Sequence, residues 1–211
     1  VASFIHPHDP YVARPEWWEL YSDDEIEMPA LTLSPEEQDP FSRRLMDGIE
    51  ASYVPLTEEE VRLARRAYLA NVSYFDSKIG ALVQTLSEIG ELDNTIIIVT
   101  ADHGDMLGER GLWYKMNFFE HSARVPLVMA GPRIAVGHAE NAVSLIDLLP
   151  TFLDIAGSDA RILGEPVDGR SLLPLARGQD DPVDEAVGDY CADMTAHPVI
   201  MFRRGTLEYI H

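Results

Sequence analysis

One stretch of the chain combines residue types that can bind ions and move protons. Asp102 and His103 come shortly after the apolar run Ile96–Val99, and Lys115 follows them after a glycine-rich loop. Carboxylate and imidazole groups are common metal ligands, whereas a lysine ammonium attracts anions. A cation binder, an anion binder and a flexible backbone therefore occur together, and this combination predicts a functional site.

A second stretch whose residues could take part in chemistry is the proline-containing segment His6–Pro10. Imidazole titrates near neutrality, so His8 can serve as a general acid. His6 is nearer the apolar residues that precede it and can instead be a packing residue. A rigid proline turn is the structural alternative for the whole segment.

Structural alternatives exist for the first stretch as well. Asp102 can cap a turn, His103 can be a hydrogen-bonded histidine at a sheet edge, and Lys115 can be a solvated surface lysine. An isolated Asp-His-Gly would favour these interpretations. The nearby glycine-rich loop and Lys115 favour a site instead.

Strands are expected to position these residues. The β-branched run Ile96–Val99 is typical of a strand buried on both faces of a parallel sheet. Ligands bind at the carboxyl ends of such strands, where Asp102 and His103 lie. Ala2–Ile5 is expected to be a short buried strand that leads into the His8 loop. Pro126–Met129 is expected to be a second buried strand.

The clearest predicted helix begins after Thr57, whose hydroxyl can cap free amides while Glu60 completes a capping box. Gly90 is its predicted stop. At 1.5 Å per residue this helix is roughly 45–50 Å long, and we expect it to pack one stripe on the sheet. The stripe consists of Val61, Ala64, Tyr68, Val72, Phe75, Ile79, Leu82, Leu86 and Ile89.

Residues 10–57 show no sustained period and are expected to form a long loop, with a short helical piece at Trp17 and Trp18. Downstream, Ser144 and Asp147 form a capping pattern before a helix that ends at Gly157. Asp159–Asp184 is expected to be loop-rich. Two further runs predict a C-terminal β-hairpin, namely Val199–Phe202 and Leu207–Ile210.

Composition limits the possible partners. The 211 residues are 46% apolar and 25% charged, which is ordinary for a globular protein and enough for one domain or a large part of one. The net charge of -20 argues against nucleic acid or an anionic membrane surface as a partner. No apolar run approaches the length of a membrane span. The single cysteine, Cys191, excludes an internal disulfide and is expected to be a buried apolar residue.

Five motifs occur along the chain, namely the run TADHGDMLGERGLWYK (Thr100–Lys115), Phe118–Glu120, Ser122–Leu127, His6–Val12 and Glu37–Pro40. Together they resemble the formylglycine-dependent sulfatases of the alkaline-phosphatase superfamily, and among them the choline-sulfatases. The resemblance implies an α/β fold with an alkaline-phosphatase-like mixed sheet flanked by helices. It also implies a C-terminal β-hairpin that belongs to a smaller subdomain.

The resemblance implies a role for each candidate residue. Asp102 and His103 would be metal ligands, and Asp102 would also take a proton from the nucleophile. Lys115 would contact the sulfate and its leaving oxygen, and His8 would protonate that oxygen. Asp193 falls where choline-sulfatases carry an acid facing the choline cation, although the family residue is Glu and Asp has a shorter reach. The metal would be divalent, with Ca²⁺ expected and Mn²⁺ as the alternative.

The chain departs from the family in lacking the Cys-x-Pro-x-Arg segment, whose cysteine becomes the formylglycine nucleophile. Cys191 precedes Ala-Asp-Met-Thr, so it is not that residue. We therefore expect an internal fragment of a longer enzyme that is inactive alone, with the formylglycine upstream. Residues 1–175 would be part of the catalytic domain with a loop insertion at 10–57, and residues 176–211 would start a C-terminal β subdomain.

The expected function is metal-dependent hydrolysis of choline O-sulfate to choline and sulfate. Within the superfamily, an aryl-sulfatase or a phosphonate or phosphodiester hydrolase is the alternative. From a different class, a non-catalytic metal-binding relative is the other hypothesis. The resemblance further implies a cytoplasmic homo-oligomer whose partner is a small sulfate ester, without nucleic acid or membrane.

Overall fold

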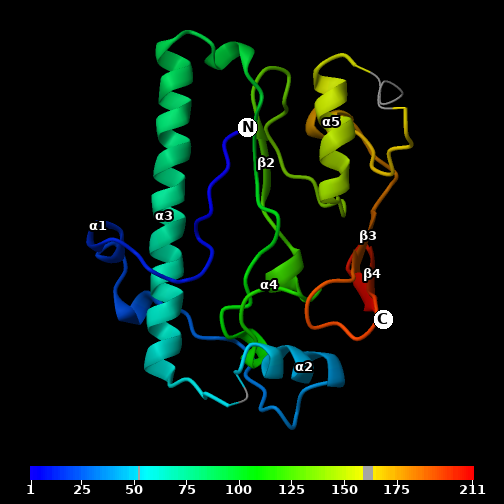
Figure 1. Cartoon of the computed structure of the whole chain (residues 1–211). Coiled ribbons are helices and arrows are strands. Elements are labelled where there is room, and N and C mark those ends of the chain that lie inside the picture. The colour runs from blue at the N-terminus through cyan, green and yellow to red at the C-terminus, as the bar shows by residue number, and fades with distance from the viewer. Residues whose placement is uncertain (52, 159–163) are drawn as a thin grey trace. The chain divides into compact units, whose positions relative to one another are not determined.

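The computed structural model of the chain describes residues 1–51, 53–158 and 164–211 (Figure 1). They divide into two compact units, which are described separately below. The first unit comprises Val1–Leu92, His103–Val125 and Ala192–Ala196, and the second comprises Asp93–Asp102, Pro126–Cys191 and His197–His211. The predicted domain division into residues 1–175 and 176–211 stays a prediction.

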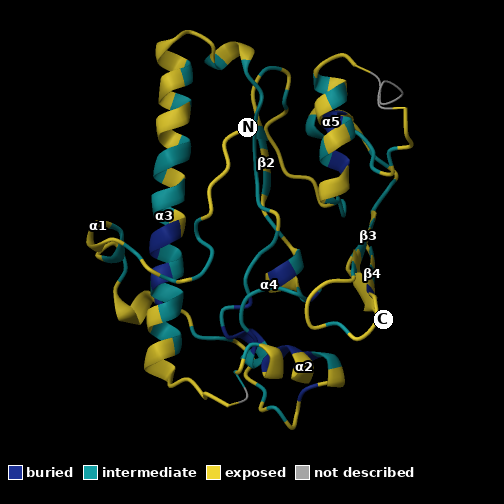
Figure 2. Ribbon diagram, in the orientation of Figure 1, coloured by how far each residue is buried: buried dark blue, intermediate teal, exposed yellow. Residues whose placement is uncertain are grey.

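The longest element of the first unit is helix α3 (Glu58–Glu88), which confirms the predicted helix. Thr57 caps it by accepting a hydrogen bond from the Glu60 amide, and the Glu60 carboxylate accepts from the Thr57 amide, so the capping box is confirmed. The middle of the helix is its most buried part, at the small or short residues Ala67, Ala70 and Asn71 (Figure 2). Neighbouring segments therefore approach the helix most closely there. The predicted packing of α3 on the sheet stays a prediction.

The N-terminal segment runs along α3 instead of forming a strand. The Phe4 ring contacts Phe75 edge-on with 5.4 Å between centroids, and His6 meets Tyr74 at 4.9 Å. The prediction of a buried strand at Ala2–Ile5 is wrong, because these residues are exposed and form no strand. A strand needs a neighbour for its hydrogen bonds, and the described part of the first unit contains no other strand.

The stretch that was predicted as a long loop contains three short helices. Helix α1 (Pro15–Trp18) confirms the predicted helical piece and packs against α3, and the 3₁₀ helix η1 (Asp23–Glu25) follows it. Helix α2 (Pro40–Gly48) was not predicted. The Asp39 carboxylate caps α2 by accepting hydrogen bonds from the amides of Phe41 and Ser42, and Pro40 is the first residue of the helix.

The core of the first unit joins α2 to the glycine-rich loop. Leu45 and Met46 of α2 are buried against Met106 and Leu112, which lie on either side of the 3₁₀ helix η3 (Glu109–Gly111). Helix α4 (Glu120–Ala123) follows this loop. Burial of these apolar side chains anchors the loop that leads to Lys115.

In the second unit, strand β1 (Ile97–Thr100) follows the 3₁₀ helix η2 (Leu92–Asn94) and pairs antiparallel with β2 (Leu127–Ala130). The expected parallel pairing is therefore wrong for these two strands. The expected burial is wrong too, because β1 is half-buried throughout and β2 alternates, with Val128 57% exposed. This alternation is typical of an antiparallel pair that leaves one face open.

The predicted capping pattern before the second helix is confirmed. Ser144 and Asp147 form a capping box around η4 (Leu145–Asp147), which continues into α5 (Leu148–Ile155). Of the predicted loop-rich region Asp159–Asp184, residues 159–163 lie outside the described residues. The remainder contains the short helix α6 (Leu173–Ala176), which contacts α5.

A second sheet has the order β3 (Glu185–Tyr190), β4 (Val199–Arg204) and β5 (Leu207–Ile210), with antiparallel pairing throughout. The predicted hairpin is confirmed as β4 and β5, whereas β3 was missed. Cys191 directly follows β3 and is exposed, so its predicted burial is wrong. Among the described helices, none has the length and apolar character that crossing a membrane requires.

Candidate active site

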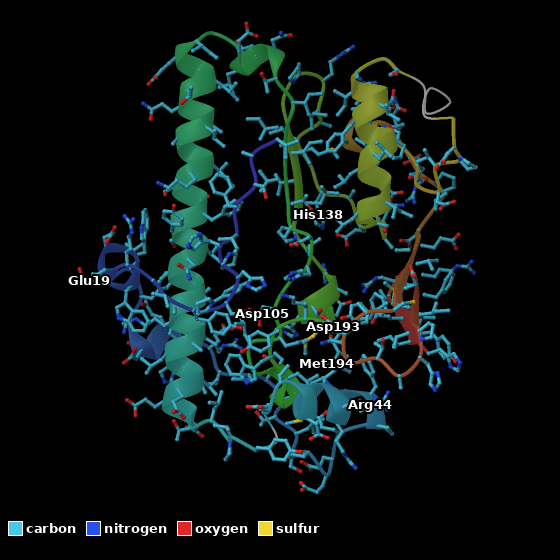
Figure 3. The ribbon with its side chains drawn as sticks, in the orientation of Figure 1. Glu19, Arg44, Asp105, His138, Asp193 and Met194 are labelled. Atoms are coloured by element: carbon cyan, nitrogen blue, oxygen red, sulfur yellow. The ribbon has the colours of Figure 1, made fainter. Side chains whose placement is uncertain are left out.

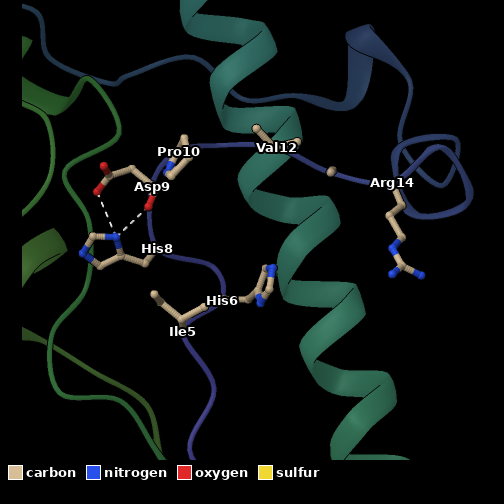
Figure 4. A pocket seen from close by; sticks show the side chains of 8 residues that line it. Ile5, His6, His8, Asp9, Pro10, Val12 and Arg14 are labelled. Carbon is tan, nitrogen blue, oxygen red and sulfur yellow. Dashed lines mark hydrogen bonds and ion pairs between the residues drawn. The ribbon is translucent and has the colours of Figure 1, made fainter.

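His8 and Lys115 form the central contact of the site. Lys115 Nζ lies 2.6 Å from His8 Nε2, and both side chains are half-buried. A lysine ammonium can only donate hydrogen bonds, so His8 Nε2 accepts and Nδ1 carries the ring hydrogen. His8 Nδ1 lies 2.8 Å from the main-chain oxygen of Asp9 and 3.1 Å from Asp9 Oδ1, as Figure 4 shows. Both nitrogens of the ring are therefore held.

His103 lies beside this pair. Its ring centroid is 6.0 Å from that of His8, with the two planes inclined at 66°. Nδ1 of His103 lies 2.8 Å from the Gly104 carbonyl oxygen. A metal-binding histidine commonly donates one ring N–H to a carbonyl in this way, which orients the other nitrogen towards the metal. The donor chemistry of His103 thus fits the role of a metal ligand.

Gly104 is required by a close approach of two backbones. A Cβ at this position would collide with the His121 carbonyl oxygen, and the Gly104 amide donates to the Ser122 carbonyl over 2.7 Å. The absence of a side chain thus allows the residues after His103 to pack against α4 (Glu120–Ala123).

Asp102 belongs to the second unit, where it is exposed and follows the end of β1 by two residues. Within the described ranges, no group of three or more His, Cys, Asp or Glu side chains is arranged to hold a metal ion. A hard cation such as Ca²⁺ takes 6–8 oxygen ligands. The Asp102 carboxylate offers such an oxygen, whereas a ring nitrogen of His103 is a softer donor.

The backbone on both sides of Lys115 has an unusual conformation. Tyr114 and Met116 have φ values of 64° and 75°, in the left-handed region that residues with a Cβ rarely occupy. The Tyr114 amide donates to Asp105 Oδ1 over 3.1 Å, and the Tyr114 carbonyl accepts from the Met106 amide over 2.7 Å. Asp105 Oδ1 also accepts from the Leu107 amide at 3.0 Å. One carboxylate oxygen therefore closes the loop that ends at Lys115.

Tyr11 connects this loop to the segment that carries His8. Its hydroxyl donates to Asp105 Oδ2 over 2.8 Å, and its ring lies next to Trp113, Tyr114 and Tyr68. Burial, followed by the neighbouring Asp105 charge, raises the pKa of Tyr11. Burial also raises the pKa of Asp105, although the hydrogen bonds from Tyr11, Leu107 and Tyr114 act in the opposite direction.

The sequence predictions missed the link between Tyr11 and Asp105. Both residues stand inside motifs that carried the family resemblance, but the hydrogen bond joins positions far apart in the chain. A polar residue at Asp105, directly before the buried Met106, was the available signal.

Asp193 lies in the segment Ala192–Ala196 of the first unit and is exposed (Figure 3). The adjacent Met194 has a φ of 66°, and its side chain packs against the end of α2, where a Cβ on Gly48 would collide with the Met194 sulfur. This contact holds the segment against α2. The role of Asp193 stays a prediction.

A pocket of about 380 Å³ is lined by eight residues between Ile5 and Arg14, including His6, His8 and Asp9 (Figure 4). This volume is within the range of about 300–1,000 Å³ that is common for small-molecule sites. Trp17 of α1 does not line the pocket; it packs edge-on against Tyr74 of α3 with 6.1 Å between centroids.

The structure thus brings His8, His103 and Lys115 together in the first unit, with Asp9, Tyr11 and Asp105 around them. Asp193 lies in a separate segment of the same unit, and Asp102 belongs to the second unit.

The chain matches the sulfatase family over residues 1–158. It is 46% identical over 210 residues to a choline-sulfatase of Rhizobium meliloti (strain 1021), covering 99% of this chain and 41% of that protein. It is 40% identical over 121 residues to arylsulfatase K of Canis lupus familiaris, covering 57% of this chain and 22% of that protein.

Among solved structures, the chain resembles the phosphonate monoester hydrolase SpPMH from Silicibacter pomeroyi. The TM-score is 0.84 at 29% identity, covering 97% of this chain and 46% of that chain. The chain thus spans less than half the length of each of these relatives. The predicted alkaline-phosphatase-like sulfatase fold is confirmed. On the family match over residues 1–158, this chain belongs to the sulfatase family.

Proposed function

We propose that the complete protein containing this chain hydrolyses choline O-sulfate to choline and sulfate. The observation that carries the proposal is the 2.6 Å contact between Lys115 Nζ and His8 Nε2. It places a fixed positive charge beside a group that can deliver a proton. The 46% identity to a choline-sulfatase supports the substrate.

Hydrolysis of a sulfate monoester makes two demands that these side chains can meet. The negative sulfate oxygens need positive charge, which Lys115 Nζ supplies. The leaving oxygen needs a proton, which His8 can deliver from Nε2 once that nitrogen has taken up a second ring proton from solvent. In this doubly protonated form Nε2 donates to the leaving oxygen and no longer accepts from Lys115. The contacts of Nδ1 with Asp9 hold the ring in both forms.

Two groups that the family uses are not part of these 211 residues. A divalent cation, with Ca²⁺ expected and Mn²⁺ as the alternative, supplies positive charge to the sulfate oxygens when it is bound, and formylglycine supplies the nucleophile. Asp102 and His103 are the residues of this chain that we propose to hold part of the cation site. Asp102 is also the proposed acceptor of a proton from the nucleophile.

Asp193 is the proposed contact for the substrate cation. A trimethylammonium group is attracted by a carboxylate, and the exposure of Asp193 leaves the side chain accessible to a small ligand. The net charge of -20 is compatible with a cationic substrate. We further propose, from the family resemblance, that the complete protein is a cytoplasmic homo-oligomer.

A second candidate function is hydrolysis of phosphonate monoesters or phosphodiesters, which the structural likeness to a phosphonate monoester hydrolase favours. Lys115 and His8 would serve a phosphorus-centred ester by the same charge and proton delivery. Aryl sulfates are a further alternative within the family. A non-catalytic metal-binding relative would have no need for the His8–Lys115 contact.

The test uses the complete protein after formylglycine formation. Release of sulfate or alcohol is measured from choline O-sulfate, p-nitrophenyl sulfate and a phenyl phosphonate ester under the same conditions. We expect the highest kcat/KM for choline O-sulfate. A preference for either other ester rejects choline O-sulfate as the substrate, and no turnover of any ester despite a confirmed aldehyde supports the non-catalytic alternative.

A further inference from the structure

The position of Lys115 depends on a backbone that is unfavourable by itself. The residues on either side, Tyr114 and Met116, both have positive φ values although both carry a Cβ. Such conformations persist only where surrounding contacts hold them, and they concentrate at functional sites. The contacts that hold Tyr114 therefore determine where the Lys115 side chain begins.

Those contacts converge on Asp105. Its Oδ1 accepts the amide hydrogens of Leu107 and Tyr114 at 3.0 and 3.1 Å, so it spans the loop from its first turn to its last residue before Lys115. The hydrogen bond from the Met106 amide to the Tyr114 carbonyl closes the same loop. Both polar groups of the Tyr114 backbone are thereby engaged.

The other carboxylate oxygen of Asp105 faces the segment that carries His8. Tyr11 is three residues after His8, and its hydroxyl donates to Asp105 Oδ2 at 2.8 Å. The Tyr11 ring also lies 6.0 Å from Trp113 and 6.4 Å from Tyr114 between centroids. Tyr11 and Asp105 therefore connect the segment of His8 to the loop of Lys115 through both a hydrogen bond and ring packing.

We propose that Tyr11 and Asp105 are positioning residues that set the contact between Lys115 Nζ and His8 Nε2. The inference rests on the proposed function, because it assigns the two residues to the reaction that Lys115 and His8 perform. Neither residue touches the substrate in this proposal. Their effect is on the orientation of two groups that must act together, so it falls on kcat and leaves KM nearly unchanged.

The first test is Tyr11→Phe in the complete, matured protein. Phenylalanine keeps the ring packing and removes only the hydrogen bond to Asp105. We expect kcat for choline O-sulfate to fall about ten- to hundredfold, because small misplacements of reacting groups are costly. The matched control is Tyr21→Phe, which removes the 2.7 Å hydrogen bond to Ser73 in the same unit. Because each substitution removes one hydrogen bond, we expect Tyr21→Phe to lower the melting temperature about as much as Tyr11→Phe does. Tyr21→Phe should leave kcat unchanged.

The second test separates hydrogen bonding from charge. Asp105→Ala removes the acceptor for the two loop amides, whereas Asp105→Asn retains a carbonyl oxygen that can accept both. The Asn amide can also donate to the Tyr11 hydroxyl. We expect Asp105→Asn to recover most of the kcat that Asp105→Ala loses. If the two variants are equally impaired, the acceptor geometry does not matter and the proposal is wrong.

A double variant distinguishes this inference from the function on which it rests. If Tyr11 acts through Lys115, Tyr11→Phe should cause little further loss of kcat in a Lys115→Ala background. Fully multiplicative losses would overturn the positioning role. Unchanged turnover of Lys115→Ala alone would instead overturn the proposed function. A fall in kcat for Lys115→Ala with none for Tyr11→Phe would reject only the positioning role.

Discussion

Two carboxylates of the first unit, Asp105 and Asp193, are held in opposite ways. Asp105 is half-buried and accepts hydrogen bonds from Tyr11, Leu107 and Tyr114. Asp193 is exposed, and its segment is held by the side chain of Met194 packed on α2 (Pro40–Gly48). Directional polar contacts suit the geometry of a reaction, whereas packing of a flexible methionine tolerates adjustment.

On this difference we expect the two regions to have separate roles in the proposed function. The Asp105 region would fix the His8–Lys115 contact that any ester needs, and the Asp193 region would select the substrate. Changes in the first region should therefore reduce kcat for all substrates. Changes in the second should alter KM for the cationic substrate alone.

The largest effect is expected for Lys115→Ala. Loss of one group that stabilises developing charge commonly lowers kcat by about 10²–10³-fold, and we expect this range for choline O-sulfate and p-nitrophenyl sulfate alike. Steady-state kinetics on both esters provide the measurement. The control is Lys78→Ala, since Lys78 lies on α3 with its Nζ 4.8 Å from the Tyr74 ring centroid. A loss confined to one ester would contradict the expectation that the His8–Lys115 contact serves every ester.

Asp193→Ala should have a smaller and selective effect. An exposed ion pair contributes little, so we expect KM for choline O-sulfate to rise about two- to tenfold while kcat stays the same. KM for p-nitrophenyl sulfate, which lacks the cation, should not change. The exposed Asp189 on β3 provides the control variant Asp189→Ala. Equal changes in KM for both esters would show that Asp193 does not recognise the cation.

Gly48→Ala tests whether packing on α2 positions Asp193. The added Cβ would displace the Met194 side chain, and we expect KM for choline O-sulfate to rise about twofold, with turnover of the aryl ester unaffected. Because Gly48 lies within α2, alanine should not reduce helix stability. Met194→Ala removes the same contact from the other side and should raise KM by a similar factor, with little further change in the double variant. Independent, multiplicative increases in KM would separate Asp193 from this contact.

The smallest effect is expected for Asp39, the N-cap of α2, and concerns the free energy of unfolding and its pH dependence. Burial alone would raise the pKa of Asp39, but hydrogen bonds from Ser42 and from the Phe41 amide hold it below its ordinary value of 3.8. A lowered folded-state pKa stabilises the protein above pH 3.8, and this stabilisation is lost as the pH falls through the folded-state value.

Asp39→Ala should therefore reduce the free energy of unfolding by about 0.5–2 kcal/mol at pH 7, as is usual for loss of an N-cap. The difference from the unchanged protein should shrink below about pH 4. Urea denaturation at several pH values from 7 to 3 measures it. A difference that stays constant over this series would show that the Asp39 carboxylate is not the cause.

The sequence predicts structural features that depend on residues close together in the chain better than features that depend on distant residues. Helix α3 was predicted because its capping box and its apolar period are local features. The strand at Ala2–Ile5 was predicted wrongly, because an apolar run does not reveal whether a partner strand is present. Cys191 was predicted to be buried because free cysteines usually are, whereas it follows the end of strand β3 and is exposed.

For the site, His8 and Lys115 were predicted through motifs that resemble a family, and the structure shows that they meet. Tyr11 and Asp105 were not predicted, because their hydrogen bond joins residues from two distant segments. Packing of Met194 on Gly48 was missed for the same reason. The residue types thus indicated which side chains could react, but not which contacts hold those side chains in position.

The loop closed by Asp105 also has a consequence for exchange of amide hydrogens with deuterated solvent. The amides of Leu107 and Tyr114 belong to no helix or strand, yet both donate to one half-buried carboxylate. Exchange at these two positions requires the carboxylate contacts to open, so it is slower than exchange at solvated loop amides. The segment before Lys115 would thus be recorded as one of the slowly exchanging parts of the first unit, although it has no regular secondary structure.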